Sequence, residues 1–85
     1  MLAHVARAHA LDHYRVALEF TDGLQGVVDL EPLLKDLDGV FTPFHDPAFF
    51  AQVSVDEEAG TIVWPNGVDL DPDVLYALLQ ESIVA

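Results

Sequence analysis

The stretch from Trp64 to Pro72 constrains the fold more than any other part of the chain. It reads Trp-Pro-Asn-Gly-Val-Asp-Leu-Asp-Pro, and a shorter version, Val-Asp-Leu-Glu-Pro, occupies residues 28–32. In each stretch an extended segment ends at Val-Asp-Leu and an acid-proline step follows. Proline at the first helical position loses no hydrogen bond that it would otherwise make. The two stretches therefore predict two strand-to-helix transitions.

Alternation of apolar and polar residues predicts the strands. Five segments qualify: residues 4–10, 14–20, 25–30, 53–55 and 61–64. In the second segment Tyr14 shares a face with Phe20, and we expect that face to lie in the core. Turns at 11–13 and 21–23 make the first three strands an antiparallel meander, since Gly23 supplies a positive φ. Residues 56–60 close the other two strands into a second hairpin.

Proline and glycine also mark the helices. We expect a short helix over Pro32–Leu37 that ends at Asp38-Gly39, then an irregular apolar segment over 40–44. A second short helix begins at Asp46-Pro47 and continues through Phe50.

The C-terminal helix is the clearest element. Asp71 is a suitable N-cap and Pro72 suits the first helical position. Its apolar face, interrupted at Ser82, follows helical spacing and consists of Leu75, Leu78, Leu79 and Ile83. We expect this face to pack on the sheet. The order of elements predicts a single α+β domain over residues 1–85.

Charge limits the partners of this domain. Fifteen acids face three bases, for a formal net charge of −12, and no Lys or Arg follows Lys35. Such a chain repels phosphate backbones and anionic lipid, so we expect no direct nucleic-acid or membrane binding. No apolar run has the length of a membrane span, and the absence of cysteine suits a reducing compartment. We expect a cytoplasmic protein.

Catalytic and metal-binding patterns are weak. The two serines, Ser54 and Ser82, occur outside any nucleophile motif, and the four histidines lack the spacing of a zinc site. The aspartates at 69, 71 and 73 alternate like the first ligands of a calcium loop. However, Val74 stands where that loop needs glycine, and Gln80 stands where it needs glutamate. We therefore expect no enzyme, catalytic residue, metal site or cofactor.

The candidate binding residues surround the second strand-to-helix transition. We predict a partner surface formed by Asp69, Asp71 and Asp73 with Trp64 or Tyr76 at its centre, because aromatic residues are frequent at interface hot spots. A competing interpretation places Trp64 in the core, where it would close the end of the sheet. Similarly, Asp29 and Asp69 are interpreted either as a carboxylate pair lining one site or as acceptors for backbone N–H groups.

On these residues the chain resembles a small bacterial family called domain of unknown function 2442. The matching pieces are Phe20-Thr21-Asp22-Gly23, Val28-Asp29-Leu30, Phe41-Thr42-Pro43-Phe44, Asp46, Phe49, Val53 and residues 61–76. The resemblance implies a small α+β domain without established catalytic residues. Some members of that family carry an added helix-turn-helix domain. Others resemble the second gene of a toxin–antitoxin-type pair, which implies a protein partner.

These observations favour a non-enzymatic, acidic protein-interaction domain that acts as an antitoxin-like or regulatory partner of a basic protein. Two alternatives stay open: a domain that senses a small molecule or divalent cation near Asp29 and Asp69, and an acidic DNA mimic. A homodimer formed through the C-terminal helix or an uncovered sheet edge also stays open.

The charge itself generates a prediction. Mutual repulsion among the acids destabilises the folded state when salt is low, because screening is then weak. We expect the melting temperature, measured by circular dichroism, to rise when moderate NaCl is added. A flat or falling response would show that the acids are locally compensated.

Overall fold

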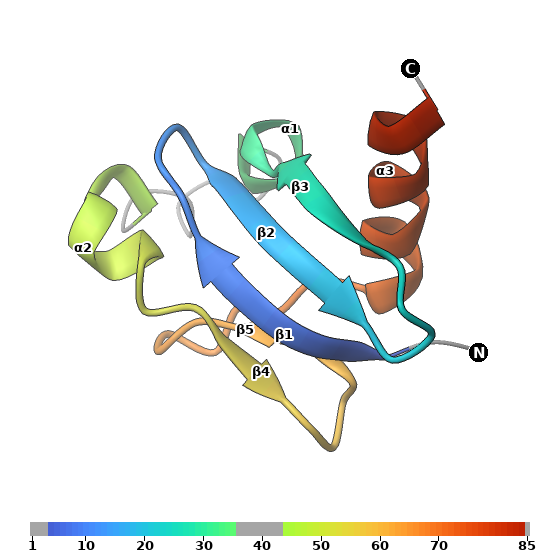
Figure 1. Ribbon diagram of the computed structural model, residues 1–85. Coiled ribbons are helices and arrows are strands. Elements are labelled where there is room, and N and C mark those ends of the chain that lie inside the picture. The colour runs from blue at the N-terminus through green and yellow to red at the C-terminus, as the bar shows by residue number, and fades with distance from the viewer. Residues whose placement is uncertain (1–3, 36–43, 85) are drawn as a thin grey trace.

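Two antiparallel sheets and three helices make up residues 4–35 and 44–84, the part of the chain that the computed structural model describes (Figure 1). The order is β1 (Val5–Ala10), β2 (Arg15–Phe20), β3 (Gln25–Asp29), α1 (Glu31–Lys35), α2 (Pro47–Phe50), β4 (Ser54–Asp56), β5 (Thr61–Val63) and α3 (Pro72–Val84). The predicted α+β class, with a meander, a second hairpin and a C-terminal helix, is confirmed. The predicted end of the first helix and most of the apolar segment lie outside the described residues.

The meander β1–β2–β3 places one face of its sheet in the core. Along β2, Val16, Leu18 and Phe20 are at most 2% exposed, whereas Ala17 and Glu19 between them point to the other face. This period-two pattern is what the sequence predicted. Helix α3 packs against β3 from the buried side, with Leu75 and Leu79 fully buried.

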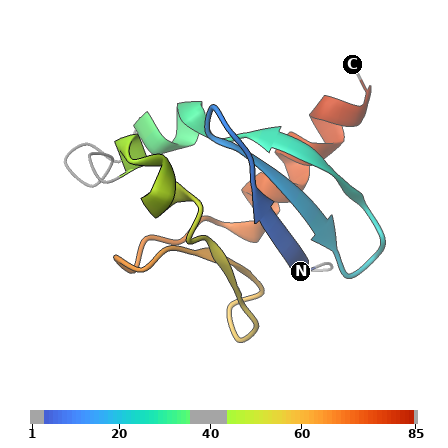
Figure 2. The same cartoon turned by 60° about the vertical axis from the view of Figure 1, so that its left-hand side comes forward.

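The hairpin β4–β5 lies on the β1 side of the meander (Figure 2). The two sheets meet where the backbone N–H of Val5 donates to the carbonyl of Gly60 at 2.9 Å. Gly60 has a φ of +70°, and a β-carbon at this position would overlap the imidazole of His4. Glycine is therefore required here both by the backbone conformation and by the close approach of His4.

An aromatic cluster fills the space between the hairpin and α2. Trp64 is only 2% exposed, and its indole N–H donates to the backbone carbonyl of Phe50 at 3.0 Å. The rings of Phe44 and Trp64 meet edge to face, with centroids 5.0 Å apart. Burial of the indole with its one polar group satisfied is the core arrangement that the sequence left open.

Strand β2 begins at Arg15, one residue later than predicted, because the turn between β1 and β2 is longer than expected. His13 and Tyr14 have φ angles of 56° and 61°, and the N–H of Arg15 donates to the carbonyl of Asp12 at 3.2 Å. Two successive left-handed residues match the twist of a tight hairpin. Tyr14 consequently lies in the turn, half-buried, with its ring edge-on to Phe50.

The two acid-proline stretches use different residues as caps. In the first, the carboxylate of Asp29 accepts the N–H of Glu31 at 3.0 Å, and α1 begins at Glu31. In the second, Asp71 accepts the N–H of Asp73 at 2.8 Å, and α3 begins at Pro72. Helix α3 therefore begins at Pro72 as predicted, whereas α1 begins at Glu31, one residue before the predicted start at Pro32.

The cap on α3 is testable by substitution. We expect Asp71→Ala to lower the free energy of unfolding by about 1 kcal/mol, because an N–H in the first turn loses its acceptor. Urea denaturation measures this loss. Asp71→Asn keeps an acceptor and should retain most of the stability, while Asp69→Ala removes the same charge without removing a cap. Equal losses in Asp71→Ala and Asp69→Ala would contradict the capping role.

Candidate functional site

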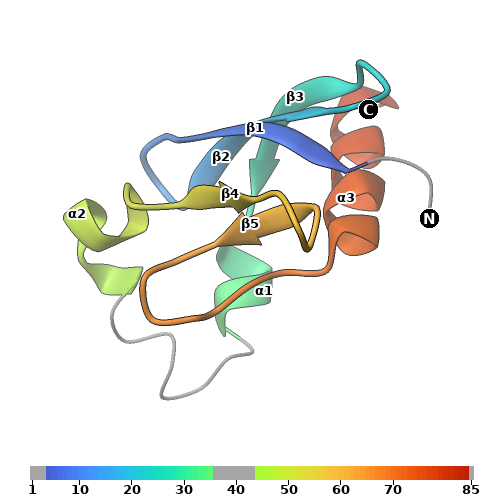
Figure 3. The same ribbon diagram turned by 90° about the horizontal axis from the view of Figure 1, so that it is seen from below.

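The connection from β5 to α3 is an ordered surface segment (Figure 3). Its turn closes through two backbone hydrogen bonds: the N–H of Gly67 donates to the carbonyl of Trp64, and the N–H of Trp64 donates to the carbonyl of Val68. Further along, Asp69 bridges to Val63. The hydroxyl of Thr61, a buried side chain, donates to the carbonyl of Leu70. These contacts hold the backbone that carries the predicted acids.

The three predicted acids are all exposed on this segment. Asp69 and Asp71 flank Leu70, and Asp73 lies in the first turn of α3. Asp71 uses one carboxylate oxygen to cap the helix. Negative charge at a helix N-terminus is favoured by the helix dipole, so the fold stabilises acids at this end of α3. The result is a group of three exposed carboxylates on this backbone segment.

Tyr76 connects this part of α3 to a residue that is distant in the sequence. It follows Asp73 by three residues, so the two side chains lie on the same side of α3. The Tyr76 ring packs edge to face against Phe20 with centroids 4.9 Å apart. Its hydroxyl donates to the carboxylate of Asp22, in the turn between β2 and β3, at 2.5 Å. We define Asp22, Asp69, Asp71, Asp73 and Tyr76 as the acidic surface.

The hydrogen bond between Tyr76 and Asp22 changes the titration of both groups. The Tyr76 hydroxyl, and then the backbone N–H of Leu24, lower the pKa of Asp22 below its usual value of 3.8. The Asp22 carboxylate raises the pKa of Tyr76 above its usual value of 10.0, first as a hydrogen-bond acceptor. Asp22 therefore stays ionised, and Tyr76 stays protonated, over a wide pH range.

The structure separates the predicted site residues. It places Asp69, Asp71, Asp73 and Tyr76 at the surface, with Tyr76 half-buried, and it places Trp64 in the core. Trp64 therefore offers no surface to a partner. Asp22 is a member that sequence reasoning missed, because it lies 54 residues from Tyr76 and was interpreted only as part of a hairpin turn.

Two arginines pair with acids that do not belong to the acidic surface. Arg7 pairs with Glu19 at 3.4 Å, and Arg15 pairs with Asp12 at 2.5 Å. The hydrogen bond from Arg15 also lowers the pKa of Asp12. In the part of the chain that the structure describes, neither arginine forms an ion pair with the acidic surface. Its carboxylates are therefore not neutralised by either arginine.

The carboxylates do not converge on one point in the described part of the chain. No group of three or more His, Asp or Glu side chains in residues 4–35 and 44–84 is arranged to hold a metal ion. Asp29 lines a hollow of about 280 Å³ between β3 and α3 with Glu81 and Ser82, and Asp69 is not part of it. The predicted pairing of Asp29 with Asp69 in one site therefore finds no support in this hollow.

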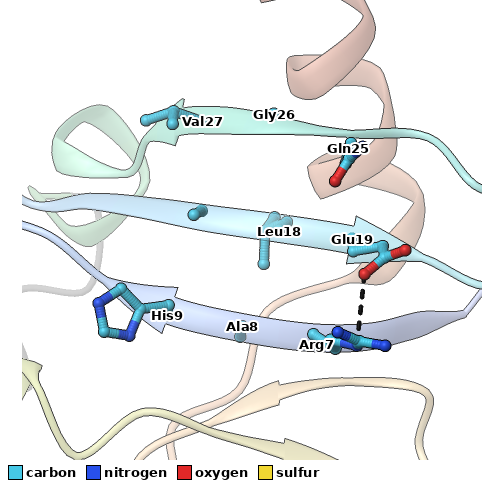
Figure 4. A pocket seen from close by; sticks show the side chains of 9 residues that line it. Arg7, Ala8, His9, Leu18, Glu19, Gln25, Gly26 and Val27 are labelled. Carbon is cyan, nitrogen blue, oxygen red and sulfur yellow. Dashed lines mark ion pairs between the residues drawn. The ribbon is translucent and has the colours of Figure 1, made fainter.

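Another hollow lies on the sheet, and none of the acidic-surface residues lines it. It measures about 500 Å³ and is open to solvent (Figure 4). Its lining comes from β1, β2 and β3 and consists of Arg7, Ala8, His9, Ala17, Leu18, Glu19, Gln25, Gly26 and Val27. Among the described helices, none is long and apolar enough to cross a membrane.

Comparison with known proteins identifies a family but no characterised relative. A family model described as "Protein of unknown function (DUF2442)" matches residues 5–81, which confirms the resemblance drawn from the sequence. No curated protein and no solved structure matches the chain significantly.

The link between Tyr76 and Asp22 makes a pH-dependent contribution to stability. Because the pKa of Asp22 is lowered on folding, this contribution is present above pH 3.8 and is lost as the pH falls through the lowered pKa. Because the pKa of Tyr76 is raised, the contribution is present below pH 10.0 and is lost as the pH rises through the raised pKa.

We expect Tyr76→Phe to melt at a lower temperature than the natural chain at neutral pH. The difference in melting temperature should narrow at strongly acidic and at strongly alkaline pH. NMR titration of the Asp22 carboxyl should show its pKa moving up towards 3.8 in this variant. In the control, Asp22→Asn, the pKa of Tyr76 should fall towards 10.0, as followed by ultraviolet absorbance. A melting difference that is constant with pH would contradict the assignment.

Proposed function

We propose that this chain, which belongs to the DUF2442 family, is a non-enzymatic interaction domain whose acidic surface binds a basic protein. The observation that carries the proposal is the group of exposed carboxylates on the β5–α3 connection, with which neither arginine pairs. A surface of one charge sign attracts an oppositely charged partner, raises the association rate and excludes partners of like charge.

The backbone supports this use of the surface. Asp69 forms a backbone bridge with Val63, and Asp71 is held by its hydrogen bond to the first turn of α3. Carboxylates on a fixed backbone lose less conformational freedom on binding than carboxylates on a mobile loop. Tyr76 adds an aromatic ring with a polar edge, a residue type that is enriched at interface hot spots.

The family resemblance suggests which protein the partner is. Because some members resemble the second gene of a toxin–antitoxin-type pair, we propose that the partner is a basic protein encoded nearby and that this chain acts as its antitoxin-like regulator. Binding would neutralise Lys or Arg side chains on the partner through charge-assisted hydrogen bonds.

The test is co-purification of the chain with the product of the adjacent gene, followed by titration calorimetry. We expect retention at low salt and an affinity that falls as NaCl is raised, because the attraction is screened. The variant Asp69→Asn/Asp71→Asn/Asp73→Asn should bind about tenfold more weakly, since it loses three exposed charge contacts. Asparagine at 71 keeps the helix cap, so the fold is preserved.

The matched control removes three exposed acids elsewhere, in Glu57→Gln/Glu58→Gln/Glu81→Gln. Both variants lose the same net charge, so only a local contact distinguishes them. Absence of binding at low salt, or equal weakening in the two variants, would overturn the proposal.

A further inference from the structure

The outer face of the meander is covered by none of the described elements. Figure 1 shows this face turned towards the viewer, with α1 and α3 behind it. Antiparallel sheets often leave one face to solvent, and such faces are usually polar. The centre of this face is formed by two apolar side chains, Ala17 and Val27, and Val27 is 41% exposed. Val74 on α3 is the other large apolar side chain exposed among the described residues.

The strand register arranges the outward side chains of this face in three rows. The middle row consists of His9, Ala17 and Val27. One outer row consists of Arg7, Glu19 and Gln25. The other outer row consists of Arg15 and Asp29. Figure 4 shows the first two rows, with the ion pair between Arg7 and Glu19 dashed.

These rows make the face electrically neutral. Its two arginines balance its two acids, which leaves thirteen acids and Lys35 in other parts of the chain. The formal net charge of −12 therefore comes from residues outside these rows, and one of them, Asp12 in the β1–β2 turn, pairs with Arg15 at the edge of the face. Two copies of so acidic a chain repel each other in most orientations, and the repulsion is least where both present a neutral surface.

We propose that the outer face of the meander is the surface through which two copies of this chain associate, about a two-fold axis that runs along its middle row. In a two-fold interface the same patch meets itself, so each contact occurs twice. An axis along the middle row brings Ala17 and Val27 against their own counterparts. It also brings each outer row against the opposite outer row of the second copy.

This arrangement is complementary in charge. On β2, Glu19 meets Arg15 of the second copy, and Arg15 meets Glu19 of the second copy. On β3, the side-chain amide of Gln25 lies where it can donate to the carboxylate of Asp29 of the second copy. Within one chain the ion pairs between Arg7 and Glu19 and between Arg15 and Asp12 are both exposed and each worth little, so exchange of partners across the interface costs little.

The size of the face predicts a weak dimer. Three strands of five or six residues span roughly 14 Å by 19 Å at ordinary strand spacing and rise. This is well below the roughly 800 Å² per partner of a standard stable interface. We therefore expect an equilibrium between monomer and dimer, with a dissociation constant of about 0.1–1 mM.

Sedimentation velocity of the full chain, from about 10 µM to about 1 mM, tests the proposal. We expect the weight-average mass to rise with concentration. Val27→Glu should raise the dissociation constant at least about tenfold, because it puts like charges opposite each other. Val74→Glu, which adds the same charge at an equally exposed valine, should change it by less than about threefold. A monomer at every concentration, or equal effects of the two variants, would overturn the proposal.

Charge reversal tests the two-fold arrangement separately. Arg15→Glu alone and Glu19→Arg alone should each weaken association, and Arg15→Glu/Glu19→Arg should restore it, because the reciprocal pairs are rebuilt with opposite sign. Failure of the double variant to recover, in a chain that circular dichroism shows to be folded, would overturn the arrangement. Self-association should strengthen as NaCl is raised, since it opposes net repulsion, whereas binding of a basic partner should weaken. The two proposals can therefore fail independently.

Discussion

Capture of backbone N–H groups by carboxylates is the interaction on which the rest of this structure depends. In residues 4–35 and 44–84, five aspartates accept a backbone N–H within two or three residues: Asp22, Asp29, Asp46, Asp56 and Asp71. Each lies where a strand or helix begins or ends and would otherwise leave a donor without a partner. At least five of the fifteen acids therefore support the fold directly, although the chain has a net charge of −12.

The surface of the domain has two parts with different electrostatics. The arginines lie on the outer face of the meander or at its turn, where Glu19 and Asp12 pair with them. The connection to α3 carries acids with no described cation beside them. A basic protein attracted by charge would therefore bind a different face from a second copy of the chain that associates through the neutral face. One chain can bind both without competition between them.

Local signals predicted the elements well because each depends on neighbouring residues. The alternation over residues 14–20 and the acid-proline steps gave the strands and helix starts to within one or two residues. The start of β2 was missed because two left-handed residues, His13 and Tyr14, form the turn, and neither is a glycine. The preference for glycine at such positions made a strand assignment reasonable for Tyr14.

The candidate site was less predictable because it depends on contacts between distant residues. The acids at 69, 71 and 73 were found because they are adjacent in sequence. The partnership of Tyr76 with Asp22 spans 54 residues, and only the packing of α3 against the meander brings the two together. Burial of Trp64 had a sequence interpretation, but its choice between core and surface depends on whether Phe50 presents a carbonyl to the indole.

The link between Tyr76 and Asp22 also connects the two surfaces. Asp22 lies in the turn that joins β2 to β3, the strands that contribute Glu19, Gln25 and Val27 to the neutral face. Tyr76 holds this turn against α3, on the side of the sheet opposite to the neutral face. Dimerisation through the neutral face would therefore leave both acidic surfaces exposed. A dimer of this kind would present two equivalent sites to a basic partner, and a partner that is itself dimeric would gain affinity from engaging both at once.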